Sequence, residues 1–193
     1  MSLYTVGIGG EPATGKTTLM RRILRKLEDT HGHGGKVFRY GLLRGIRFNL
    51  TYVLGIYDEG TFAGTDRLSM AVQTDATTFL RQQSRVDASP VVLFEGDRLF
   101  NHSFLTTCED LGETAWFNLT CPETVLTSRH ARRQDTQTAL WLKGRRTKIL
   151  NVKKYHEVVD LPTGNPSEGE EAVYRVWQHV LVFTQPYIKT ETL

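Results

Sequence analysis

The chain has 193 residues, enough for one domain whose core needs no disulfide or structural metal to fold. Hydrophobic residues make up 39% of the sequence and charged residues 23%, an ordinary globular balance that excludes a fibrous or disordered chain. The two cysteines, Cys108 and Cys121, have neither metal-ligand nor redox spacing. Because there is also no signal peptide and no apolar run of transmembrane length, we expect a cytoplasmic protein without membrane attachment.

The net charge of +3 at neutral pH conceals two basic blocks with an acidic region between them. Residues 16–47 contain nine Lys and Arg against two acidic residues, and residues 129–154 contain nine against Asp135 alone. Residues 48–128 reverse the balance, with eleven acidic residues against four basic ones. Two positive segments that face one polyanionic ligand would account for this pattern, and a solvated charged surface is the simpler alternative.

A phosphate-binding motif lies close to the N-terminus. Gly10, Gly15, Lys16 and Thr17 fit the pattern of two glycines with four residues between them, then Lys and Ser or Thr. Residues 3–8 form an apolar, β-branched run that predicts a buried strand, and the apolar residues after the motif have the spacing of one helix face. Since strand, loop and helix are the context that the motif requires, the sequence predicts a nucleotide-binding P-loop.

The chemistry of this loop follows from its backbone. Glycines let successive N–H groups point inward as an anion nest, and the helix N-terminus adds partial positive charge. We expect Lys16 to contact the β- and γ-phosphates of ATP, and the Thr17 hydroxyl to hold Mg²⁺. The predicted nucleotide-binding residues are Gly10, Glu11, Pro12, Ala13, Thr14, Gly15, Lys16, Thr17 and Thr18.

The middle of the chain predicts a strand at 36–40, then a β-hairpin or extended excursion in which 52–57 and 61–63 flank the turn 58–60. A helix is predicted over 68–85. Asp66 comes just before that helix, and two interpretations compete. As an N-cap, its carboxylate would accept backbone N–H bonds. As a functional group, it would be a base or a metal-organising carboxylate at the junction of loop and helix.

A second acidic position follows the next predicted strand. Val91–Phe94 form a four-residue apolar run after Pro90, which indicates a core strand beside the P-loop strand, and Glu95-Gly96-Asp97-Arg98 come directly after it. Ligands of open parallel α/β sheets bind at the carboxyl ends of the strands. Glu95 or Asp97 is therefore the expected partner of Mg²⁺ or of the acceptor, and we assign Glu95 with Thr17 to the metal.

The C-terminal half continues the alternation of strands and helices. The expected elements are a strand at 115–119, a helix with Arg129, His130, Arg132 and Arg133, a short helix from Asp135 through Trp141, a basic segment to Lys154, a strand at 156–161, and a last helix opened by a Ser167/Glu170 capping box. This alternation predicts an α/β fold with a doubly wound parallel sheet of about five strands. We expect a single domain over 1–193.

These features resemble the nucleotide and nucleoside kinases. In those kinases the third strand ends in an acid-glycine turn with a nearby arginine. The sequence Glu95–Arg98 is similar to that turn. The resemblance implies an arginine-rich lid at about 122–154, in which Arg129 and Arg133 neutralise the transferred phosphoryl group, because the guanidinium fork binds phosphate oxygens bidentately. It also implies that residues 161–165 pack against adenine.

A narrower resemblance involves Gly64–Gln73 together with Phe94–Asp97. These stretches are similar to the 5-hydroxymethyluracil DNA kinases of tailed bacteriophages with hypermodified thymidine. The resemblance implies transfer of the ATP γ-phosphate to the hydroxymethyl group of the base within DNA, in the host cytoplasm. The two basic blocks would then neutralise the DNA backbone, and the target base would leave the stack or be presented single-stranded.

The resemblance gives each candidate residue a role. Lys16 holds phosphates, Asp66 orients and deprotonates the acceptor hydroxyl, and Asp97 is the second candidate for that base. For a DNA acceptor, we expect some of the cations beyond the lid arginines to contact backbone phosphates; these are Arg145, Arg146, Lys148, Lys153 and Lys154. Two alternatives stay open: a deoxynucleoside monophosphate or nucleoside kinase, and a non-catalytic ATP-binding switch.

Overall fold

A computed structural model describes residues 3–58, 63–86, 88–132 and 138–188. Within these residues seven strands form one sheet in the order β2-β3-β4-β5-β1-β6-β7. The strands are β1 (Leu3–Gly10), β2 (Lys36–Tyr40), β3 (Leu43–Phe48), β4 (Thr51–Leu54), β5 (Val91–Glu95), β6 (Gly112–Thr120) and β7 (Val158–Pro162). The α-helices are α1 (Lys16–His31), α2 (Val72–Gln83), α3 (His102–Leu111), α4 (Glu123–Arg132), α5 (Ala139–Tyr155) and α6 (Pro166–Ile188).

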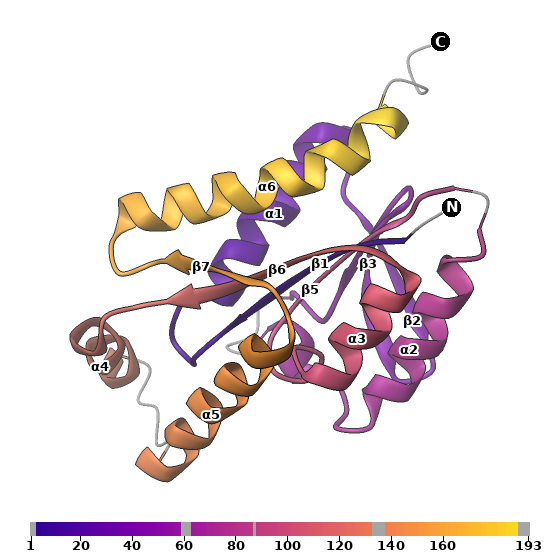
Figure 1. Ribbon diagram of the computed structural model, residues 1–193. Coiled ribbons are helices and arrows are strands. Elements are labelled where there is room, and N and C mark those ends of the chain that lie inside the picture. Colours follow the sequence, from indigo (N-terminus) through magenta and orange to yellow (C-terminus); the bar gives the residue numbers. More distant parts are fainter. Residues whose placement is uncertain (1–2, 59–62, 87, 133–137, 189–193) are drawn as a thin grey trace.

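Helices cover both faces of the sheet, as the predicted α/β class requires. Figure 1 shows α1 and α6 side by side over one face, and α2 and α3 over the other. The first face buries Ile8 and Leu93 of the sheet with Val176 of α6, and the second buries Phe94 with Phe104 of α3. Because β1 and β5 contribute to both cores, nearly every residue in them is apolar and buried.

The sheet is larger than the predicted one. Five strands, β4-β5-β1-β6-β7, run parallel to one another, in agreement with the predicted parallel sheet of about five strands. Strands β3 and β2 extend the sheet at the β4 edge; β3 is antiparallel to β4, and β2 is antiparallel to β3. Strand β3 is absent from the sequence prediction. Residues 51–54 pair in parallel with β5, and one antiparallel bridge between Ile56 and Gly64 joins the two sides of the predicted excursion. The expected turn lies partly outside the described residues, which omit 59–62.

Three predicted helix boundaries are wrong. Residues 65–67 form a 3-10 turn, and α2 starts only at Val72. The segment to Tyr155 is not an irregular basic stretch but one helix, α5, whose N-cap Thr138 accepts a hydrogen bond from Trp141 N. Helix α6 begins before the predicted capping box: Asn165 accepts from Glu168 N, and the Glu168 carboxylate accepts from Gly164 N. Asp135, the expected start of the short helix, lies outside the described residues.

Within the described residues, no helix is both long and apolar enough to cross a membrane.

Candidate active site

The P-loop connects the end of β1 to the start of α1. Gly10 and Gly15 have φ angles of 139° and 98°, and Ala13 adopts a left-handed φ of 64°, so the backbone curls between the two elements. A Cβ atom built on Gly15 would meet nothing within 4 Å, which leaves open space before the helix N-terminus. Lys16 Nζ donates to the carbonyl oxygens of Gly10 (2.8 Å) and Glu11 (2.9 Å). The loop thus has the backbone conformations that an anion nest uses, and the Lys16 ammonium group is held against its carbonyl oxygens.

Thr17 and Glu95 meet at the foot of the loop. The Thr17 hydroxyl donates to Glu95 Oε1 at 3.1 Å, and Glu95 ends β5 with only 1% of its surface exposed. Burial raises the pKa of Glu95 to about 7; Lys16 and the Thr17 hydrogen bond oppose this shift, and the carboxylates of Asp66 and Asp97 add to it. A cation at this position would favour the ionised carboxylate.

A hydroxyl and a carboxylate are the hard oxygen donors that suit Mg²⁺. Within the described part of the chain, no group of three or more His, Cys, Asp or Glu side chains is arranged to hold a metal by itself. This sparse donor set fits Mg²⁺ in a nucleotide site, because the ion keeps several waters and takes its other ligands from phosphates. Thr17 and Glu95 are thus the residues that would hold it.

The segment around Asp66 packs directly on the end of β5. Gly64 has a φ of 85°, and a Cβ atom there would lie 1.9 Å from Glu95 Oε1, so only glycine fits. Thr65 Oγ1 donates to the Glu95 carbonyl oxygen at 2.6 Å. Asp66 Oδ1 accepts from the backbone N–H of Asp97 at 2.9 Å. These contacts hold three acidic side chains, those of residues 66, 95 and 97, at the carboxyl end of the sheet.

The N-cap interpretation of Asp66 is wrong. Helix α2 has Ala71 as its N-cap residue, with no side-chain cap bond, and Asp66 instead bonds across 31 residues to Asp97. Asp66 stays in contact with solvent, where an acceptor can approach it. Partial desolvation, followed by the nearby Asp97 carboxylate, raises the pKa of Asp66, and Lys16 opposes the shift. A raised pKa brings a carboxylate closer to the range in which it can act as a general base.

Helix α5 brings cations to these carboxylates. Arg145 forms a 2.8 Å ion pair with Asp97 Oδ2, and Lys148 Nζ donates to the Asp97 carbonyl oxygen at 2.5 Å. Burial lowers the pKa of Lys148 despite the opposing attraction of Asp97. The sequence prediction placed these two residues beyond the lid arginines and did not assign them to the site. The sequence contains a signal of this arrangement, because Arg145 and Lys148 are three residues apart and such positions share a helix face.

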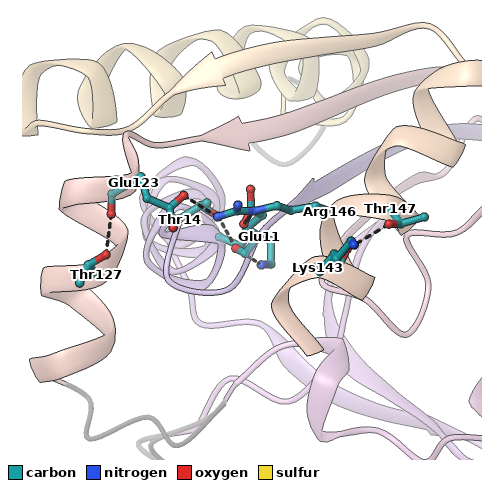
Figure 2. Close-up of polar contacts among 8 residues, drawn as sticks. Glu11, Thr14, Glu123, Thr127, Lys143, Arg146 and Thr147 are labelled. Atoms are coloured by element: carbon teal, nitrogen blue, oxygen red, sulfur yellow. Dashed lines mark hydrogen bonds and ion pairs between the residues drawn. The ribbon is translucent and has the colours of Figure 1, made fainter. Parts of the chain in front are cut away.

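Arg146 reaches from α5 to the P-loop. Its Nε donates to Glu11 Oε2 at 2.7 Å, and its second terminal nitrogen donates to Glu123 Oε2, in the first turn of α4, at 2.5 Å. Figure 2 shows the guanidinium between the two carboxylates, which come from elements 112 residues apart in the chain. This residue connects the lid segment to the phosphate loop, and the sequence prediction did not assign it to the site. Lys153, in the last turn of α5, bonds instead to Asp160 of β7.

A cleft of about 390 Å³ opens on the other side of the P-loop. Arg129 of α4 crosses its wall and donates to Ala13 O (3.1 Å) and Thr163 O (2.7 Å), while the Thr163 hydroxyl donates to Thr14 O (2.7 Å). Gly164 and Asn165 also line the cleft, so the segment expected to pack on adenine borders it. Arg129 thus lines this cleft beside the P-loop. Arg133, predicted to act with it, lies outside the described residues.

The sequence matches no protein-family profile and no curated relative. Among solved structures the chain is similar to a gluconokinase from Sinorhizobium meliloti 1021, with 12% identity, 97% of each chain covered and a TM-score of 0.50. A shikimate kinase from Bacteroides thetaiotaomicron gives 13% identity over 92% of this chain and 98% of that chain, with a TM-score of 0.45. A sugar kinase from Janibacter sp. HTCC2649 gives 15% identity over 99% and 100%, with a TM-score of 0.48.

At such low identity the likeness to the gluconokinase concerns the fold alone. The chain has the α/β fold of P-loop kinases, and the loop and helix that define this class are complete in the structure.

Proposed function

We propose that this protein is an ATP-dependent phosphotransferase that moves the γ-phosphate to an acceptor hydroxyl group. The observation that carries the proposal is a continuous set of contacts at the carboxyl end of the sheet. Thr17 bonds to Glu95, Glu95 is packed against Gly64 and Thr65, and the adjoining Asp66 bonds to Asp97. Phosphate-binding and acid–base groups therefore lie within one connected site, as phosphoryl transfer requires.

The side chains divide the work of the reaction. Lys16 and the loop N–H groups bind the phosphates, and Thr17 with Glu95 holds Mg²⁺, which offsets phosphate charge when bound. Asp66 orients the acceptor hydroxyl and takes its proton, with Asp97 as the second candidate. Arg145, Arg146 and Lys148 would neutralise charge on the transferred group once it competes with their present carboxylate and carbonyl partners.

For the acceptor, we propose the 5-hydroxymethyl group of 5-hydroxymethyluracil in DNA. The proposal is supported by the resemblance of Gly64–Gln73 and Phe94–Asp97 to kinases of that substrate, and these two segments contact each other here. It is also supported by the basic residues on α1, β2, β3 and α5, which suit a polyanionic acceptor. A base within a duplex would have to leave the stack to reach Asp66.

The test is transfer of labelled γ-phosphate to matched acceptors. Single-stranded and duplex oligonucleotides that contain 5-hydroxymethyluracil are compared with thymidine oligonucleotides of the same sequence, and with free 5-hydroxymethyldeoxyuridine monophosphate and thymidine monophosphate. We expect label on the hydroxymethylated DNA alone, and none with Lys16→Ala. Label on a free nucleotide would indicate a nucleotide kinase instead. ATP binding without transfer to any acceptor would contradict the phosphotransferase proposal and favour the switch.

A further inference from the structure

A second cavity, of about 220 Å³, lies at the β2–β3 end of the sheet. Three arginines line it, Arg39 of β2, Arg44 of β3 and Arg67 of the 3-10 turn, together with Leu42, Leu68 and Ser69. Neither the P-loop nor the predicted lid contributes to it. Three guanidinium groups around a small cavity form a site for an anion with several oxygen atoms.

The strand register brings two of these charges together. Arg39 and Arg44 are directly opposite each other in the antiparallel β2–β3 pair. Like charges at directly opposite positions destabilise a sheet. Within the described residues, the Arg44 side chain has no hydrogen bond or ion pair, and Arg39 Nε bonds only to Gly41 O at 3.0 Å. An anion between the two arginines would remove their repulsion.

The two acidic residues near the cavity, Asp58 and Asp75, already have partners. Asp58 forms an ion pair with Arg67 and accepts a bond from Arg21 at its backbone oxygen. Asp75 Oδ2 accepts from Leu42 N at 2.7 Å on the rim of the cavity. Among the described residues, the three guanidinium groups of the cavity are thus balanced by the Asp58 carboxylate and by Asp75 on the rim, so positive charge remains in excess.

The cavity adjoins the acceptor side of the candidate active site. Arg44 O accepts from Gly55 N at 2.8 Å, and the β4–β5 register puts residue 55 level with Glu95, so Arg44 lies in the same row across the sheet as that carboxylate. Two strand spacings of about 4.8 Å separate the two backbones by roughly 10 Å. Arg67 directly follows Asp66, and the Leu68 carbonyl accepts from Arg98 Nε at 3.3 Å.

We propose that Arg39, Arg44 and Arg67 bind a phosphate ester of the acceptor, on the opposite side of Glu95 from the P-loop. This role rests on the proposed function, whereas the binding itself does not. The ester could belong to a nucleic-acid backbone or to a small phosphorylated acceptor, because both carry the same anionic oxygens.

The experiment measures binding without turnover. The variant Arg39→Gln/Arg44→Gln is compared with wild type and with the control Arg81→Gln, a change at an exposed position of α2. Oligonucleotide affinity is measured by fluorescence anisotropy over a range of salt concentrations. ATP affinity and the melting temperature of the free protein are measured on the same samples.

If the cavity binds a backbone phosphate, the double variant loses about tenfold or more in oligonucleotide affinity. The slope of log K against log salt also flattens by about one unit. ATP affinity stays within threefold, and the melting temperature stays level or rises, because the cross-strand repulsion is gone. A merely structural role would lower the melting temperature instead.

A second arm distinguishes the source of the phosphate, with thymidine monophosphate and inorganic phosphate as ligands. Stabilisation of the wild type by thymidine monophosphate that is lost in the double variant assigns the cavity to a small phosphorylated acceptor. The cavity proposal is overturned if the double variant equals wild type and Arg81→Gln in every binding assay. That result leaves the phosphotransferase proposal intact. Conversely, if the double variant binds oligonucleotide more weakly but the wild type transfers no phosphate, the cavity proposal stands and the phosphotransferase proposal fails.

Discussion

The two sides of the candidate active site are built in different ways. The nucleotide side consists of one continuous segment, Gly10–Thr18, with Arg129 and Thr163 added at its border. The acceptor side is assembled from three separate segments, which meet through the Asp66–Asp97 and Arg145–Asp97 contacts. A continuous motif carries its own geometry, whereas an assembled site depends on the whole sheet and on α5 for its geometry.

This difference predicts separable effects. Changes on the nucleotide side should alter ATP binding whatever the acceptor, and changes on the acceptor side should alter transfer with ATP still bound. The four substitutions below test this separation, in order of the expected loss.

The largest loss is expected for Lys16→Ala. The Lys16 ammonium lies among the loop carbonyls, where it is positioned to contact the transferred phosphate. We expect phosphoryl transfer to fall by about 10²–10³-fold or more, as when an electrostatic donor to a developing charge is removed. Arg25→Ala, at an exposed position of α1, is the control and should keep full activity. Circular dichroism checks the fold, and a rate within a few-fold of wild type would separate the loop from the chemistry.

Gly64→Ala tests the assembly of the acceptor side. The added Cβ would collide with the Glu95 carboxylate at a φ of 85°, so both the backbone and the metal-holding group must shift. We expect destabilisation of about 1–3 kcal/mol and a reduced response of transfer to Mg²⁺. Gly144→Ala is the matched control, because its Cβ has open space in α5 and should stabilise the protein by about 0.5–1 kcal/mol. Thermal unfolding with both variants gives the comparison, and equal melting temperatures would refute the steric argument.

Arg145→Gln removes the cation paired with Asp97. We expect kcat to fall about 10–100-fold, because charge stabilisation of the transferred group weakens, with ATP affinity within threefold of wild type. Asn151→Ala, at an exposed position of the same helix, serves as the control. A loss of ATP affinity equal to the loss of kcat would assign Arg145 to the nucleotide side.

The smallest loss is expected for Arg129→Gln. Its guanidinium bonds to the carbonyl oxygens of Ala13 and Thr163 and so joins the P-loop to the segment after β7. We expect ATP to bind about tenfold more weakly, equivalent to roughly 1.4 kcal/mol, with little change in kcat. Isothermal titration calorimetry measures this affinity, with Arg132→Gln on the exposed end of α4 as the control. Unchanged affinity would remove Arg129 from the nucleotide site.

Local signals predicted what is local in the fold. The strand Leu3–Gly10, the P-loop and α1 follow from glycine spacing and apolar periodicity, and the structure agrees with them. The run 91–94 predicts a strand by its unbroken apolar character, which a strand buried on both faces requires.

The missed elements depend on distant contacts. In β3, Leu43 and Phe48 are buried on opposite faces of the sheet and Arg44 and Arg47 are exposed, so the strand lacks a regular alternation. Its arginines belong to a basic block that indicates only a charged surface. In α5, Gly144 lowers the intrinsic helix preference, and like charges one turn apart repel each other. The helix forms with its cations paired to Glu11, Asp97 and Asp160, acids that no local pattern identifies as their partners.

The position of Asp66 illustrates the same limit at the site. Its sequence context permits an N-cap, and only the backbone N–H of Asp97, 31 residues away, shows what the carboxylate binds. Proximity in the chain favoured the cap, and the sheet brought the actual partner.

The most direct test of the separation between the two sides is Asp66→Asn, with ATP affinity and single-turnover transfer measured on the same sample. The amide oxygen can still accept from Asp97 N, so the turn and the melting temperature should be kept, but the proton acceptor is lost. We predict ATP affinity within threefold of wild type and transfer slower by about two to four orders of magnitude. Near-normal transfer would contradict the account and make Asp97 the candidate base, and a parallel loss of ATP affinity would show that the two sides are not separate.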